Sequence, residues 1–140
     1  MFNEHGEFTV IRQGNILLAH SSGAWNVETA KAYTININKI IEPIKDKPWA
    51  LISNVEMWEL CTPDCQILML ELSAESRDKG LKREAVVNNN TESVKLDLFH
   101  KRTNKGTSET LEPSHVFQRC FFETDKQARQ WLTNEGYSHR

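Results

Sequence analysis

One stretch near the middle of the chain constrains the fold more than any other. Residues 48–54 read PWALISN, a short apolar run that ends in polar side chains. The run is continuous rather than alternating, which is typical of a strand covered on both faces in a parallel sheet. Thr62-Pro63-Asp64 then supplies a capping residue, a proline at the first helical position and an acid in the first turn. A buried strand followed by a helix indicates an α/β domain.

Further strands and helices are predicted on both sides of this unit. Residues 7–12 and 15–20 are rich in apolar and β-branched side chains and flank Gln13-Gly14, which predicts a β-hairpin. Ser21-Ser22-Gly23 is expected to break the second strand, and a helix capped by Asn26 then carries apolar residues at three- and four-residue spacing. The remaining predictions are a helix from Thr62 to Gly80, a strand over 85–87, a helix after Thr91, a strand over 116–122 and a helix capped by a Thr124–Gln127 capping box.

The order of these elements predicts the fold class. It is β-β-α-β-α-β-α-β-α, which indicates a mixed, mostly parallel sheet of about five strands with helices packed against it. The chain of 140 residues is long enough for one domain with its own core, so residues 1–140 are treated as a single domain. The polar residues 103–115 are expected to form a mobile loop.

Composition excludes several classes of function. The net charge is −2 with acidic and basic residues interspersed, which argues against a nucleic-acid partner. No apolar run approaches the roughly 20 residues that cross a bilayer, so stable membrane insertion is not expected. The first ten residues lack the basic and apolar regions of a signal peptide. Together with an odd number of cysteines, this predicts a cytoplasmic location with free thiols.

Residues spread over nearly the whole chain resemble the SpoIIAA-like branch of the STAS-domain proteins. They are mostly core and capping residues, which specify a fold better than a function. The resemblance implies a non-enzymatic regulatory or protein-interaction module without a cofactor; the best-known members are antagonists of anti-sigma factors. The matching residues are Gly23-Ala24-Trp25, Pro48-Trp49-Ala50-Leu51, Trp58, Ala85-Val86-Val87 and Phe122-Glu123-Thr124-Asp125 with Ala128 and Trp131-Leu132.

The phosphorylation site of those antagonists is not matched. In them, a serine at the start of the second helix lies in an Asp-Ser-like motif after the central strand. The corresponding residues 54–64 read NVEMWELCTPD and contain no Asp-Ser pair. Thr62 is the nearest hydroxyl, and a role as helix cap is enough to explain it. We therefore do not expect the usual phosphoserine switch.

The same segment is the predicted partner surface, because partners often meet an α/β sheet beyond its central strand. As an interaction surface it is expected to be a loop and helix start that exposes Trp58 and Glu59. For Trp25 and Trp58 burial under loops is the favoured reading, and joint exposure as an aromatic platform is the alternative. The candidate surface residues are Asn54, Glu56, Trp58, Glu59, Thr62 and Asp64.

No catalytic or metal-binding residue is predicted. Cys61 and Cys65 are spaced C-x-x-x-C, which matches neither a thioredoxin motif nor a zinc site, and small buried roles are favoured for them. The start of a helix could still lower the thiol pKa of Cys65. No two histidines are spaced as metal ligands. Glu56, Glu59 and Asp64 could act as acids or bases, but solvated side chains are the commoner case.

Two alternatives to an interaction module remain open. The SpoIIAA-like branch is grouped with folds related to the lipid-carrying CRAL-TRIO domains, which suggests a carrier or sensor of a lipid or other apolar small molecule. That function requires a closed apolar cavity beneath the isoleucine-rich first helix or the second helix. An unrecognised enzyme would instead require a polar cleft with a perturbed acid or thiol. Apolar helix faces would also allow a homodimer.

Overall fold

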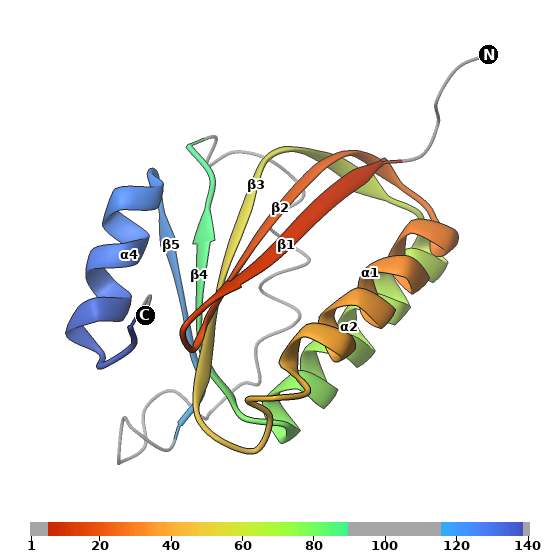
Figure 1. Cartoon of the computed structure of the whole chain (residues 1–140). Coiled ribbons are helices and arrows are strands. Elements are labelled where there is room, and N and C mark those ends of the chain that lie inside the picture. The colour runs from red at the N-terminus through yellow and green to blue at the C-terminus, as the bar shows by residue number, and fades with distance from the viewer. Residues whose placement is uncertain (1–5, 90–115, 139–140) are drawn as a thin grey trace.

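Five strands form one sheet in the spatial order β1-β2-β3-β4-β5 (Figure 1). The computed structural model describes residues 6–89 and 116–138. β1 and β2 are antiparallel, and β2, β3, β4 and β5 run parallel. The strands are β1 (Glu7–Gln13), β2 (Ile16–Trp25), β3 (Trp49–Cys61), β4 (Leu81–Val87) and β5 (Gln118–Phe122), and the helices are α1 (Val27–Ile41), α2 (Pro63–Asp78) and α4 (Asp125–Asn134).

This arrangement confirms the predicted mixed, mostly parallel α/β sheet. α1 and α2 cover one face, and α4 packs on the opposite face against β3, β4 and β5 (Figure 1). β2, β3 and β4 are parallel and lie side by side in sequence order. Because such crossovers are right-handed, the two connecting helices, α1 and α2, lie on the same face of the sheet. The helix predicted after Thr91 and the loop predicted over 103–115 lie outside the described residues.

The hairpin forms where the sequence predicts it. Gln13 pairs with Ile16, which leaves a two-residue turn in which Gly14 has a φ of +65°. Glycine adopts this left-handed conformation without the steric cost that a side chain would add. The expected break of the second strand at Ser21-Ser22-Gly23 is wrong, since β2 continues to Trp25. Register shifts between His20 and Ser22 and between Gly23 and Trp25 absorb the irregularity.

The third strand is also longer than predicted. Residues 54–61 were expected to form a polar loop, but they continue β3 as far as Cys61. They pair with the second half of β2, with Ser22 opposite Met57 and Trp25 opposite Cys61. The pairing of β3 with β4, in contrast, ends at Asn54 opposite Val87. Residues 55–61 therefore form an extension of β3, which is called the β3 extension below.

Each described helix begins at a residue that the sequence identifies as a cap. The Asn26 side chain accepts a hydrogen bond from the Thr29 amide at 3.0 Å, and Thr62 caps α2. Thr124 and Gln127 form the predicted capping box at the start of α4. Such side chains satisfy backbone donors that have no partner within the helix. Local sequence therefore determines where these helices begin.

Two apolar clusters lie on the two faces of the sheet. The cluster beneath α1 and α2 is the larger and includes Trp25, Trp49 and Trp58. The cluster beneath α4 contains smaller side chains, among them Ala85, Ala128 and Leu132. β3 contributes to both clusters because alternate residues of a strand point to opposite faces. The central strand is thereby buried on both sides.

Candidate functional site

The predicted partner surface is divided by the structure between exposed and buried side chains. Glu56, Glu59, Thr62 and Asp64 are exposed, and Asn54 is half-buried. The Asn54 side-chain oxygen accepts a hydrogen bond from the Glu56 amide at 3.1 Å. The three acids are therefore solvated, as the commoner case predicts. Met57 and Leu60, which the sequence reasoning did not select, are 62% and 54% exposed.

The alternative in which Trp58 is exposed on the partner surface is wrong. Its side chain is only 4% exposed and packs edge-on against Trp25, with ring centroids 5.9 Å apart. Trp25, itself 2% exposed, also contacts Tyr33 and Phe8, so the favoured burial of both tryptophans is confirmed. A large aromatic side chain is stabilised more by packing in the core than by exposure to solvent at the end of the sheet. Trp58 thus anchors the β3 extension to the core.

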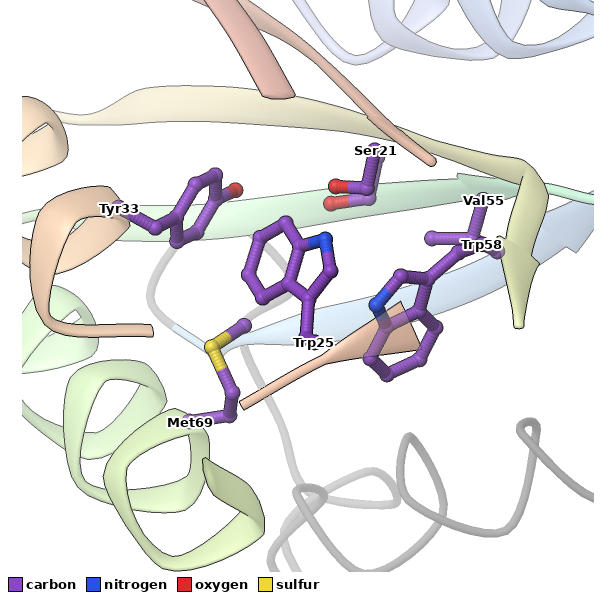
Figure 2. A pocket seen from close by; sticks show the side chains of 7 residues that line it. Ser21, Trp25, Tyr33, Val55, Trp58 and Met69 are labelled. Atoms are coloured by element: carbon purple, nitrogen blue, oxygen red, sulfur yellow. The ribbon is translucent and has the colours of Figure 1, made fainter. Parts of the chain in front are cut away.

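A small cavity lies beside these aromatic rings. Figure 2 shows Trp25 between Tyr33 and Trp58, with Met69 of α2 on one side of the cavity. Ser21, Ser53 and Val55 complete its lining. Its volume is about 20 Å³. Such a volume accommodates about one water molecule and not an acyl chain.

A short hydrogen-bond network lies at the start of α2. The Thr62 hydroxyl donates to Asp64 Oδ1 at 2.6 Å and accepts from the Cys65 amide at 3.4 Å. The Cys65 amide also donates to Asp64 Oδ1 at 2.9 Å. Chiefly through the Thr62 hydroxyl, these bonds hold the pKa of Asp64 below its ordinary value of 3.8. Asp64 is therefore a carboxylate near neutral pH and not a proton donor.

The idea that the helix start lowers the thiol pKa of Cys65 is wrong. The Cys65 side chain is fully buried, and its hydrogen bond with Cys61 together with burial raises the pKa of the thiol. Burial penalises the charged thiolate more than the helix terminus favours it. Cys61, Cys65 and Cys120 are all free thiols. The small, buried role favoured for Cys65 is confirmed.

A buried ion pair was missed by sequence reasoning. Arg119 of β5 donates to Glu84 Oε1 of β4 from Nε and Nη2 at 2.9 and 2.8 Å. The two side chains are 1% and 0% exposed. Ser53 donates to the other oxygen of Glu84 at 2.8 Å, and Ser73 of α2 lies 3.4 Å from Arg119 Nη2. Glu84 directly precedes the predicted strand 85–87 and Arg119 lies inside the predicted strand 116–122, so these two charges beside apolar strand residues were the available signal.

The arginine of this pair also stacks on an aromatic ring. The guanidinium carbon of Arg119 lies 4.9 Å from the centre of the Phe117 ring, and that of Arg77 lies 5.2 Å from it. Burial, and then the neighbouring charge of Arg119, lowers the pKa of Arg77. The paired charges satisfy one another's hydrogen bonds and hold β3, β4, β5 and α2 together. The cluster therefore has a structural role, because it joins four elements inside the core.

Among the residues that the structure describes, no three side chains of histidine, cysteine, aspartate or glutamate are close enough to hold a metal ion. No described helix combines the length and the apolar character that spanning a membrane requires.

Comparison with solved structures identifies the fold. No protein-family model matches the chain, and no curated protein matches it. An uncharacterised protein of the DUF3478 family from Shewanella loihica PV-4, which has a SpoIIAA-like fold, aligns with a TM-score of 0.65 at 16% identity, over 94% of this chain and 97% of that one. The mouse anion transporter Solute Carrier 26 family member A9 aligns with a TM-score of 0.59 at 10% identity, over 94% of this chain and 22% of the transporter. The chain has a SpoIIAA-like, STAS-like fold, as the resemblance predicts.

Proposed function

We propose that this chain is a non-enzymatic, STAS-like module that binds a protein partner through the β3 extension and the start of α2. One observation carries the proposal. Val55 and Trp58 fasten the extension to the core, while Glu56, Met57, Glu59 and Leu60 are exposed along it. Exposed apolar side chains beside charged ones on a strand are typical of a protein-binding surface.

Two further features agree with this proposal. Met57 and Leu60 offer flexible and branched apolar contacts of the kind that fill a partner's pockets, while the carboxylates around them can select a partner by its charge. We also propose that the module acts in the cytoplasm, where a reducing environment keeps its three cysteines as free thiols. Thr62 serves as a cap in this proposal and not as a regulated phosphorylation site.

Affinity capture with the tagged full chain tests the proposed surface. Partners retained from a lysate of the source organism are identified by mass spectrometry for the wild type and for Glu56→Lys/Glu59→Lys. We expect the double charge reversal to abolish retention of a partner that the wild type binds, because it places like charges in the interface. Glu75→Lys, a charge reversal at an exposed position on α2, is the matched control and is expected to retain the partner. Equal retention by the double variant, or no specific partner for the wild type, contradicts the proposal.

Native mass spectrometry separates this function from the carrier alternative. The cavity of about 20 Å³ beneath α1 and α2 does not support an acyl-chain ligand. We therefore expect the mass of the unliganded chain, and the same spectrum reports whether it is a monomer or a homodimer. A reproducible excess mass that extracts into organic solvent would favour the carrier function over the interaction module.

A further inference from the structure

A groove on the α4 face of the sheet is lined by residues outside the β3 extension. α4 packs on β3, β4 and β5, and the other half of this face, on β1 and β2, presents Ile11, Leu18 and His20 beside it. Ile11 is 54% exposed and His20 is exposed, whereas Leu18 is partly buried. The groove between this half and the start of α4 has a volume of about 140 Å³.

The size of the groove limits what it can hold. A cavity of about 150 Å³ accepts a molecule the size of benzene, so the groove has room for one side chain of a partner. Its floor and walls are apolar and consist of Ile11, Leu18 and Ile52. It is too small for an acyl chain or a nucleotide.

The rim of the groove has a different chemistry. Thr9, His20, Asn54 and Asp125 line it, and Asp125 supplies a carboxylate in the first turn of α4. The Asn54 side-chain oxygen accepts one hydrogen bond, from the Glu56 amide, and a carbonyl oxygen can accept two. Lys126, the next residue along α4, lines a separate hollow with Trp131. The groove therefore combines an apolar floor with oxygen acceptors at its mouth.

The charged residues around the groove also limit what it can bind. His20 and Asn54 are opposite each other in the pairing of β2 with β3, at the carboxyl end of the sheet. Among the described residues at this end, acidic side chains outnumber the basic ones, which are Lys31, Lys126 and Arg129. The acids are Glu7, Glu28, Glu56, Glu59, Asp64, Glu123 and Asp125. Such a field attracts a cationic partner and repels an anionic one.

We propose that the groove receives an arginine side chain presented by the protein partner. The three methylenes of arginine lie along Ile11, Leu18 and Ile52, and the guanidinium donates to the Asp125 carboxylate and the Asn54 amide oxygen. Arginine fits better than lysine because its planar head donates several hydrogen bonds in fixed directions. The inference rests on the proposed interaction function, and it shares Asn54 with the predicted partner surface.

The test uses the full chain labelled with ¹⁵N and a free probe, N-acetyl-L-arginine amide. Saturable amide shifts are expected at Ile11, His20, Asn54 and Asp125. N-acetyl-L-norleucine amide, which keeps an apolar stem without the charge, should bind at least about tenfold more weakly, since a charge-assisted hydrogen bond is lost. Equal binding of the two probes, or shifts without saturation, would overturn the inference.

Four variants locate the bound probe. Asp125→Asn removes the charge that receives the guanidinium, and Ile11→Thr removes an exposed wall; both should weaken arginine amide about tenfold or more. Glu28→Gln is the control for Asp125→Asn, because it removes a first-turn acid from the same end of the molecule without touching the groove. Ile35→Thr, at an exposed position on α1, is the control for Ile11→Thr. Unchanged binding by Asp125→Asn would overturn the inference.

This experiment and the capture experiment can fail separately. If arginine amide does not bind but Glu56→Lys/Glu59→Lys still loses the partner, the groove assignment is wrong and the interaction function stands. If arginine amide binds at the groove but Glu56→Lys/Glu59→Lys retains the partner as the wild type does, the proposed surface on the β3 extension is wrong. Asp125→Asn in the capture experiment then shows whether the partner uses the groove.

Discussion

At the scale of single residues, the start of α2 depends on one hydroxyl group. Thr62 accepts from the Cys65 amide and donates to Asp64. Thr62→Ala should lower the free energy of unfolding by about 1 kcal/mol, because the first turn loses its cap. Urea denaturation measures this, and Thr62→Asn, which keeps a capping oxygen, is the control. A Thr62→Ala variant as stable as the wild type would show that the cap contributes nothing.

Asp64 predicts a dependence of stability on pH. Its pKa is lower in the folded chain than the ordinary value of 3.8, chiefly because Thr62 donates to it. A carboxyl of this kind stabilises the fold above its unfolded pKa, and this contribution is lost as the pH falls through the folded pKa. Between about pH 5 and pH 2, the wild type should therefore lose more stability than Asp64→Asn. Urea midpoints measured across this range test the sign, and parallel curves would contradict it.

Cys65 predicts a pattern of thiol reactivity. Its thiol is buried and has a raised pKa, so little thiolate is available to an alkylating reagent. Iodoacetamide applied to the native chain at mildly alkaline pH should label Cys61 before Cys65. Mass spectrometry of proteolytic fragments reads the order of labelling, and labelling in urea confirms that Cys65 reacts once exposed. Rapid labelling of native Cys65 would contradict its assigned environment.

At the scale of elements, the Glu84–Arg119 pair joins β4 to β5 inside the core. Glu84→Gln leaves the charge of Arg119 buried without its carboxylate, which typically costs about 3–5 kcal/mol. The double variant Glu84→Leu/Arg119→Met removes both charges and should recover most of this loss. Chemical denaturation of the three proteins measures the difference.

An exposed ion pair provides the control for that experiment. Glu42 and Lys45 lie 3.2 Å apart at the end of α1, with side chains 67% and 39% exposed. Glu42→Gln should change the free energy of unfolding by less than about 1 kcal/mol, since solvent screens the pair. If Glu84→Gln lowers the free energy of unfolding no more than Glu42→Gln does, the buried pair does not have the structural role that its geometry indicates.

At the scale of the whole molecule, the two faces of the sheet should differ in stability against local opening. Residues 49–53 of β3 are buried on both faces, whereas α4 buries only Ala128 and Leu132 fully. We expect the amides of residues 49–53 to exchange hydrogen only through global unfolding and α4 amides through a less costly local opening. Leu132→Ala should then speed exchange in α4 well before it affects β3. Equal exchange free energies in both elements would contradict this order.

Local sequence determined the fold class, the hairpin and the starts of the described helices. The turn at Gly14, the caps at Asn26 and Thr62 and the Thr124–Gln127 capping box each depend on residues within one turn of one another. The continuous apolar run from Trp49 to Ile52 likewise identified the strand buried on both faces. Short-range backbone chemistry and apolar periodicity are readable from a sequence because they need no distant partner.

Only the tertiary structure decided how residues 54–61 are arranged. The sequence predicts a loop there, but pairing with β2 and the packing of Trp58 against Trp25 extend β3 instead. The same long-range packing brings Glu84 to Arg119, and Asn54 to Asp125 across the groove. These outcomes depend on partners distant in sequence, so the energy that decides them appears only when the sheet has assembled.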